Sequence, residues 1–524
     1  MFQKKNFTLI IQIIFVLFVL FYYLYYKNSY FSHWSYALDQ DITIIYNSLL
    51  LTSSIDQEYL DHPGYTTMFI LNIVYQIAYL FKIISISSFN DLVLSLNKDK
   101  IIQDIYNISL IVHLIYSLIF LHLLFKILNS FINDKTSCFF LICIILISPA
   151  FIHLFDIIRS EILSLIFCFL YFIYLEKFVI KGSKYLIISG IFFSLALFAK
   201  VQVIFLIYSF LILFLIRNKT KIKQINFLSY KFYKDTYYEI NLKIFLINLL
   251  FAILVIIFCL NFFYKVIDGL FFIFIFLSHF FILILFLKEK QFITTPIILF
   301  SFGAIISVIF MKYLGLSFVS NSFHPELIKV VANPISQSAN ISSSYKFTKV
   351  DNIDFLFLLI DFIKKIPETS HGKYAQFNIV FNKLSVLTYL ISIFYIFFNF
   401  IKKKKTNLLT IIIINLIITV VNLIFSIRPY QQYLIYSFPL NLILLSIIVK
   451  NQSISKYIIF FTLMFYIYLD FENIKSSINE IRKDNGNMDS ICTEDYLNNK
   501  STYMRMHRKI DKKFLIELCN DFNN

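Results

Sequence analysis

Apolar runs of about twenty residues recur along almost the whole chain, and no other feature constrains its fold as strongly. A helix of roughly 20 residues spans the hydrocarbon core of a bilayer. Strands of a membrane barrel would alternate polar and apolar residues, and these runs do not alternate. The pattern therefore predicts an all-α, polytopic membrane protein.

The composition supports this expectation. Of 524 residues, 59% are hydrophobic and only 15% are charged, below the share of about 25% that is usual in soluble domains. A net charge of +16 would suggest nucleic acid as the partner of a soluble protein. Here the basic residues gather in short segments between apolar runs, so membrane lipids are the expected partners and nucleic acid is not.

The runs predict about thirteen transmembrane helices. Their expected bounds are Phe7 to Tyr26, Ile105 to Leu128, Cys138 to Phe155, Ile162 to Ile180, Tyr185 to Ala199, Val201 to Ile216, Ile244 to Phe263, Leu270 to Leu287, Phe292 to Met311, Leu384 to Ile401, Leu408 to Ile427, Tyr433 to Val449 and Tyr457 to Phe471. The apolar run Thr66 to Ile84 is expected as a helix at the outer surface, because counting it as a span would reverse every later loop.

The charge distribution predicts the orientation. With a cytoplasmic amino terminus, the segments on that side hold 22 basic residues against 5 acidic ones, including the cluster Lys402 to Lys405. This bias is typical of cytoplasmic loops. We therefore expect a multi-pass protein of the plasma (inner) membrane, and an odd number of spans places its carboxyl terminus outside.

Long external segments are expected at residues 27–104 and 312–383 of a transmembrane domain formed by residues 1–471. Residues 472–524 form a small external tail. Loops of this length often carry function. In the tail, an oxidising compartment would allow Cys492 and Cys519 to form a disulfide, and the sequence leaves this open.

The first external loop contains the most informative stretch, residues 34–63. It gathers six ionisable side chains, namely Asp39, Asp41, Asp56, Glu58, Asp61 and His62. A carboxylate there can accept a proton from a hydroxyl or bind a divalent metal. In an extended segment the Asp-x-Asp spacing aims both carboxylates the same way. The alternative is a solvated acidic loop with a helix N-cap.

This stretch resembles the first external loop of the integral-membrane glycosyltransferases of the GT-C class, such as protein O-mannosyltransferases and the lipid A aminoarabinose transferase. In that class an acidic pair follows the first span, and the mannosyltransferases have an Asp-x-His-Pro-Pro motif further along. Here Asp39 and Asp41 precede Asp61-His62-Pro63-Gly64. The pair reads Asp-Gln-Asp and Gly64 replaces the second proline, so either Asp39 or Asp41 corresponds to the base.

The resemblance implies further site residues at later outer turns. Asp156, Arg159 and Glu161 are expected to form a second acidic site near the outer ends of the third and fourth spans, unless Arg159 simply pairs with one of the two acids. Lys200 is expected at an outer turn between two short spans, close to the donor phosphate. Its alternative role is a snorkelling anchor.

Arg428 ends one outward span, and Tyr433 begins the next. The class often has an Arg or His followed by aromatic residues at this turn. The planar fork of Arg suits a phosphate, and its charge would stabilise a leaving polyprenyl phosphate. The alternative is an arginine that only marks the membrane boundary.

Together these residues predict a glycosyltransferase that moves a sugar from a polyprenyl-phosphate donor to a lipid, glycan or protein acceptor on the outer (periplasmic) side. The expected catalytic residues are Asp39 and Asp41, with Lys200 and Arg428 receiving the phosphate. The other expected substrate-binding residues are Asp61, His62, Asp156, Arg159, Glu161 and Tyr433. The sequence specifies no cofactor; a divalent metal, Mg or Mn, stays open, and if one binds, Asp39, Asp41 and Glu161 are its expected ligands.

Two other functional classes remain as alternatives. A polysaccharide polymerase or ligase also has many spans, but relies on cations and His rather than on an acidic first loop. A transporter or lipid flippase places ionisable groups near the middle of the membrane and often shows duplicated halves. The sequence has no Gly-rich phosphate loop and no Gly-x-Ser-x-Gly signature, so nucleotide-driven chemistry is unsupported.

Overall fold

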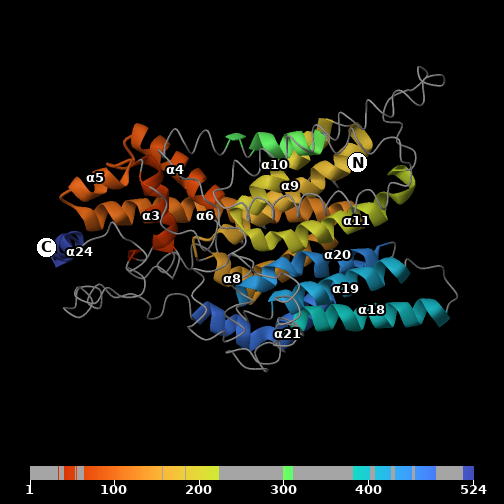
Figure 1. Cartoon of the computed structure of the whole chain (residues 1–524). Helices are drawn as coiled ribbons and strands as arrows, with labels where there is room; N and C mark the ends of the chain where they lie inside the picture. Colours follow the sequence, from red (N-terminus) through yellow and green to blue (C-terminus); the bar gives the residue numbers. More distant parts are fainter. Residues whose placement is uncertain are drawn as a thin grey trace, which may run out of the picture. The chain divides into compact units, whose positions relative to one another are not determined.

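The computed structural model describes residues 33–34, 41–53, 55, 64–155, 157–182, 184–222, 299–307, 309–310, 382–401, 408–425, 431–450, 455–479 and 512–523. All regular elements of these ranges are helices (Figure 1). The chain divides into two compact units. The first comprises Met1–Tyr59, Thr67–Arg159 and Leu445–Asn524, and the second comprises Leu60–Thr66 and Ser160–Leu444.

The first unit is built around one long helix, α6. Its helices are α3 (Asp41–Thr52), most of α4 (Tyr65–Leu80), α5 (Phe89–Leu94), α6 (Lys98–Ile132), α7 (Lys135–Leu146), α8 (Pro149–Phe155), α21 (Ser455–Asn479) and α24 (Lys512–Asn523). Helix α4 packs on α6, where the hydroxyls of Tyr75 and Ser109 lie 2.6 Å apart. Helix α21 packs on α7, with the rings of Phe140 and Phe460 centred 5.4 Å apart.

Local polar residues separate α6 from α7. Asn133 adopts the left-handed conformation, with φ 57°, and its N–H donates to the Asn129 carbonyl. Asn tolerates this conformation better than most residues, so it commonly ends helices. The next residue, Asp134, accepts hydrogen bonds from the backbone N–H groups of Thr136 and Ser137 and starts α7. Two adjacent side chains thus end one helix and begin the next.

The expected span Cys138 to Phe155 is not one straight helix. Helices α7 and α8 are bent by 69° at the break between them. Pro149 has no backbone N–H to continue α7, but it fits the first turn of a new helix. Ser148 also accepts a hydrogen bond from the Phe151 N–H and so caps α8. The pair forms a broken span or a re-entrant loop.

The second unit contains the helices of the middle of the chain. They are α9 (Ser160–Lys181), α10 (Lys184–Ala199), η2 (Val201–Val203), α11 (Ile204–Ile222), the helical residues 299–307, α18 (Lys383–Ile401), α19 (Leu408–Phe425), η5 (Gln431–Tyr436) and most of α20 (Phe438–Val449). Helix α9 lies beside both α10 and α11 (Figure 1). The expected span Tyr433 to Val449 is divided at Ser437, because Pro439 has no backbone N–H to donate to the preceding turn and fits only the first turn of a new helix.

Among the described residues, four helices are long and apolar enough to cross a membrane: α6, α9, α18 and Tyr457–Lys475 of α21. The bent pair α7 and α8 raises this number to five if it is one span. This arrangement agrees with a polytopic membrane protein. The expected spans Phe7 to Tyr26, Ile244 to Phe263 and Leu270 to Leu287 lie outside the described residues, so the number thirteen stays a prediction.

Polar side chains join α18, α19 and α20 of the second unit. Asn441 Nδ2 donates to the Ser385 hydroxyl at 3.1 Å, and the Thr388 hydroxyl donates to Asn441 Oδ1 at 2.6 Å. Asn422 Nδ2 donates to the same Ser385 hydroxyl at 3.0 Å. In lipid, such hydrogen bonds between helices take the place of a hydrophobic driving force.

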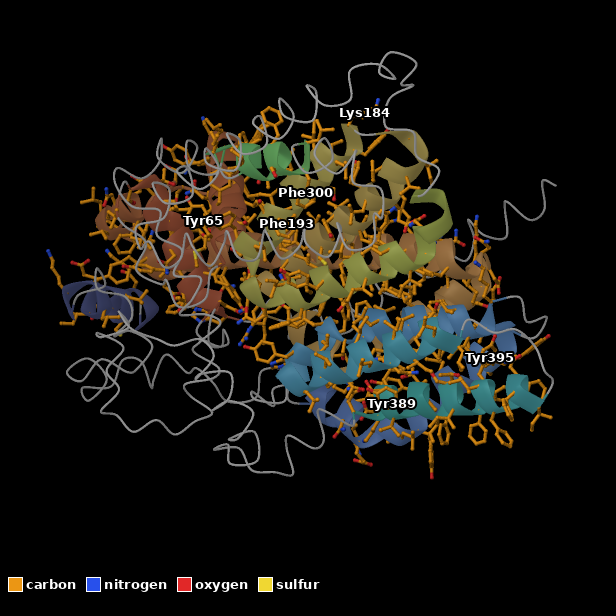
Figure 2. The ribbon with its side chains drawn as sticks, turned by 45° about the vertical axis from the view of Figure 1, so that its right-hand side comes forward. Tyr65, Lys184, Phe193, Phe300, Tyr389 and Tyr395 are labelled. Atoms are coloured by element: carbon orange, nitrogen blue, oxygen red, sulfur yellow. The ribbon has the colours of Figure 1, made fainter. Side chains whose placement is uncertain are left out.

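Two glycines let α10 approach the helical residues 299–307. A Cβ atom on Gly190 would collide with the Phe300 carbonyl, and one on Gly303 would collide with the Ile187 backbone. Small residues at such contacts allow two membrane helices to pack backbone against backbone. Figure 2 shows Phe193 and Phe300 together at this contact, with ring centres 5.3 Å apart.

We therefore expect Gly190→Ala to destabilise the protein by about 1–3 kcal/mol, because the added methyl group must push the two backbones apart. Helix propensity alone predicts the opposite, a gain of roughly 1 kcal/mol. Thermal unfolding of the purified protein in detergent distinguishes the two, with Gly303→Ala as the matched partner. The double variant should lose less than the sum of the single losses. A Gly190→Ala variant as stable as the parent would refute this close contact.

Candidate functional site

Asp41 is the first residue of α3, and its side chain is fully buried. Its Oδ1 atom accepts a hydrogen bond of 2.9 Å from the backbone N–H of Ile158. A carboxylate at the first turn of a helix is also stabilised by the helix dipole. The Asp41 carboxylate thus accepts a hydrogen bond from a residue 117 positions later in the chain, and it connects α3 to the segment before α9.

The segment that Asp41 contacts carries another of the expected residues, Arg159. Residues 157–159 connect α8 to α9 without regular structure. Arg159 follows Ile158 directly and is only 6% exposed. Both residues belong to the first unit, as does Asp41. The structure thus brings the acidic first loop into direct contact with the segment that was expected to hold the second acidic site.

Glu161 and Lys200 form a buried ion pair in the second unit. Lys200 Nζ lies 3.1 Å from Glu161 Oε1, and both residues are 0% exposed. Lys200 is placed as expected, in the turn between α10 and η2. A snorkelling lysine would extend its ammonium to the surface; this one is enclosed, which excludes the snorkelling interpretation.

The two charges also match the helix ends that carry them. Glu161 lies in the first turn of α9, where the partial charge of the helix end is positive. The Lys200 N–H donates to the Ala196 carbonyl, so Lys200 directly follows the last turn of α10, where the partial charge is negative. Because α9 and α10 lie side by side, one end of this helix pair collects both stabilising effects.

Tyr436 of the 3-10 turn η5 lies close to this ion pair. The Tyr436 hydroxyl is 3.4 Å from the Ser164 hydroxyl, and Ser164 is one helical turn after Glu161. Tyr433, which was expected to bind substrate, is 4% exposed and lies in the same 3-10 turn as Tyr436. The buried end of α9 therefore combines a carboxylate, an ammonium and hydroxyl groups, which are the groups that bind phosphates and sugars.

The other five expected site residues lie outside the described residues, namely Asp39, Asp61, His62, Asp156 and Arg428. In the part of the chain that the structure describes, no group of three or more His, Cys, Asp or Glu side chains could hold a metal ion. Asp39, one of the three expected metal ligands, lies outside this part, so the expected metal site stays a prediction.

The sequence reasoning missed the pairing of Glu161 with Lys200 and the neighbouring Ser164 and Tyr436. A signal for the pair was present, because the two residues are nearly equidistant from the Gly182 turn that joins α9 to α10. An antiparallel helix pair brings such positions level with each other. For Tyr436 and Ser164, 272 residues apart, no sequence signal exists.

A comparison with known protein families gives one match. The family model described as dolichyl-phosphate-mannose-protein mannosyltransferase matches residues 100–232. Residues 100–232 are similar to that family. The match confirms the resemblance to the protein mannosyltransferases and supports a glycosyltransferase of the GT-C type. It includes Arg159, Glu161 and Lys200, and it begins after Asp41.

No curated protein and no solved structure matches the chain. The family match covers about a quarter of the chain. The first loop therefore has no counterpart among these comparisons, and its assignment depends on its own residues.

We expect Lys200→Met to destabilise the protein by about 3–5 kcal/mol, because it leaves the buried Glu161 carboxylate without its ammonium. Glu161→Met should have a similar effect on the isolated Lys200. The double variant replaces the pair by apolar side chains of similar volume and should recover most of the loss. Thermal unfolding in detergent measures all three. Additive losses in the double variant would show that the two charges do not stabilise each other.

Proposed function

We propose that the chain is a glycosyltransferase that transfers a sugar from a polyprenyl-phosphate-linked donor to an acceptor on the outer side of the plasma membrane. The observation that carries the proposal is the similarity of residues 100–232 to the dolichyl-phosphate-mannose-protein mannosyltransferases. This part of the chain includes the buried pair of Glu161 and Lys200. The acidic first loop, with the buried carboxylate of Asp41, adds the group that such a reaction needs.

The charges of α9, α10 and α11 support the outer side. The carboxyl-terminal ends of α9 and α11 and the amino-terminal end of α10 lie together. This end carries four basic residues, namely Lys177, Lys181, Lys184 and Arg217. Basic residues at span ends favour the cytoplasm. The pair of Glu161 and Lys200 belongs to the opposite end, which is therefore assigned to the outer side.

The proposed reaction needs a base and a cation. Asp39 or Asp41 accepts the proton of the acceptor hydroxyl, and the resulting oxygen nucleophile attacks the anomeric carbon of the sugar. The bond between that carbon and the phosphate oxygen breaks, with inversion at the carbon. Lys200 and Arg428 stabilise the charge that the polyprenyl phosphate gains as it leaves.

The other proposed residues shape the sugar pocket, namely Asp61, His62, Asp156, Arg159, Glu161 and Tyr433. For Asp41, the hydrogen bond from the Ile158 N–H fixes the carboxylate before substrate arrives. Fixed groups accelerate a reaction because they need no reorganisation in the transition state.

The position of the buried ion pair argues against a transporter. Transporters hold their ionisable site residues near the middle of the bilayer, often on broken helices. The described buried pair instead joins the first turn of α9 to the residue after α10. Charges at helix ends favour chemistry at the membrane surface.

The function is tested with purified protein and a series of radiolabelled polyprenyl-phosphate sugars. Mannose is the first sugar of the series, because the description of the matching family names it. Transfer of label from the lipid carrier to acceptors in washed membranes is the result expected. A protein that is folded and releases no label from any donor of the series contradicts the proposal.

Replacing both Asp39 and Asp41 by Asn should lower transfer by at least about 100-fold, because no carboxylate is left to accept the proton. The two single variants show which of them is the base. Asp41→Asn keeps a carbonyl oxygen that can accept the Ile158 N–H. It therefore removes the proton acceptor while it keeps the hydrogen bond to residues 157–159.

Asp134→Asn is the matched control for these variants. Its carboxylate also accepts backbone N–H groups, at the start of α7, and it has no part in the proposed reaction. The control should transfer sugar at the parent rate. A folded double variant with undiminished transfer would remove the catalytic role from this loop.

A further inference from the structure

The amino-terminal end of α6 is capped by the far end of the chain. Its N-cap residue, Asn97, makes no side-chain capping hydrogen bond. The N–H of Lys98, in the first turn of the helix, instead donates to Asp521 Oδ2 at 2.8 Å, across 423 residues of sequence. The acceptor belongs to the carboxyl-terminal helix α24. A carboxylate there is also favoured by the dipole of α6.

Two further contacts fix α24 on the same turn of α6. Lys98 Nζ lies 2.8 Å from Glu517 Oε2 and 5.7 Å from the centre of the Phe514 ring. Lys98 is only 3% exposed, whereas the Glu517 side chain is 40% exposed. Helix α24 buries Phe514, Leu515 and Leu518. It is thus a docked part of the first unit.

A row of aromatic rings continues from α24 to α3. The Phe514 ring is centred 6.2 Å from the Phe89 ring on α5, and Phe89 lies 5.1 Å from the Tyr46 ring on α3. Such tilted and edge-on pairs are attractive beyond their burial alone. The Ser53 hydroxyl also accepts the Phe89 N–H at 2.8 Å, which ties the end of α3 to the start of α5.

The chain just before α3 is fixed to the same end of α6. The Trp34 ring N–H donates to Asp99 Oδ1 at 2.7 Å, and the Trp34 backbone N–H donates to Gln103 Oε1 at 2.7 Å. Asp99 and Gln103 lie in the first two turns of α6. The buried carboxylate of Asp41 is therefore held between two attachments, one before it at Trp34 and one after it through Tyr46 and Phe89.

We propose that α24 positions the first external loop for catalysis. Asp521 and Glu517 fix the amino-terminal end of α6, and Phe514 fixes the Phe89 side chain. The end of α6 and Phe89 in turn hold α3, which carries Asp41. This inference rests on the proposed function. The carboxyl-terminal residues act here as positioning residues, because they contact the scaffold of Asp41 and not the reacting groups. Small displacements of a catalytic group reduce rates strongly, so loss of the contact lowers the turnover number.

The test uses the full chain with single substitutions in α24. Asp521→Ala removes the acceptor of the Lys98 N–H, whereas Asp521→Asn keeps a carbonyl oxygen in its place. Phe514→Ala removes the ring that contacts Phe89. Lys513→Ala is the matched control, because that side chain is 84% exposed and its 3.9 Å ion pair with Glu517 lies within α24 and is weak at such exposure.

Transfer kinetics with radiolabelled polyprenyl-phosphate mannose, or the donor that proves active, give the first readout. Asp521→Ala and Phe514→Ala should lower kcat about tenfold, with the KM for the donor unchanged within about twofold. Asp521→Asn and Lys513→Ala should keep the parent kcat. Unchanged kcat in Asp521→Ala and Phe514→Ala overturns the positioning role.

Hydrogen exchange gives a second readout that needs no activity. The amides of α3 (Asp41–Thr52) should exchange faster in Asp521→Ala than in the parent, while those of α9, in the other unit, should not change. Unchanged exchange in α3 overturns the coupling even if the variant is inactive. Faster exchange in both helices shows general loosening and also counts against the proposal. A parent protein without transfer refutes the proposed function, whereas the exchange experiment still decides the coupling.

Discussion

Buried sites solvate charge poorly, and this constraint governs the buried charges of the described helices. An ammonium or carboxylate that is removed from water needs a partner, because several kcal/mol of hydration are lost. Glu161 and Lys200 satisfy each other at 3.1 Å, and each lies at the helix end whose dipole favours its charge. The same requirement explains the hydrogen bonds of Ser385 with Asn422 and Asn441. Polar groups thus hold together helices that lipid alone would not drive together.

Helix positions could be predicted from the sequence because they depend on local apolar runs. The expected span Ile162 to Ile180 is helix Ser160–Lys181, and Leu384 to Ile401 is helix Lys383–Ile401. The helix bounds differ from the expected spans where one residue overrides the hydrophobic pattern. Pro149 divides an apolar run into α7 and α8, although the run itself is long enough to span. A hydropathy average over the run barely changes with one proline, so it does not detect the break.

The contacts of the candidate site depend on pairs far apart in sequence, and spacing cannot specify these. Asp41 was expected to be functional because of its acidic neighbours, but its hydrogen bond to the Ile158 N–H spans 117 residues. Glu161 was expected as part of an acidic site with Asp156, and Lys200 as an isolated cation, but their pairing needed the antiparallel arrangement of α9 and α10. Asp521 was not noticed at all, since an acidic residue in a polar tail is unremarkable without the helix end that it caps.

The length of α6 explains where the attachments of the first loop lie. Its 35 residues extend roughly 52 Å, well beyond the hydrocarbon core of about 30 Å. The exposed stripe of Ile111, Ile115 and Ile119 suits lipid, whereas the turns before it carry Lys98, Asp99 and other polar residues. This end of α6 therefore stands outside the hydrocarbon. Single ion pairs are weak there, so several contacts from Trp34 and α24 are needed to hold it.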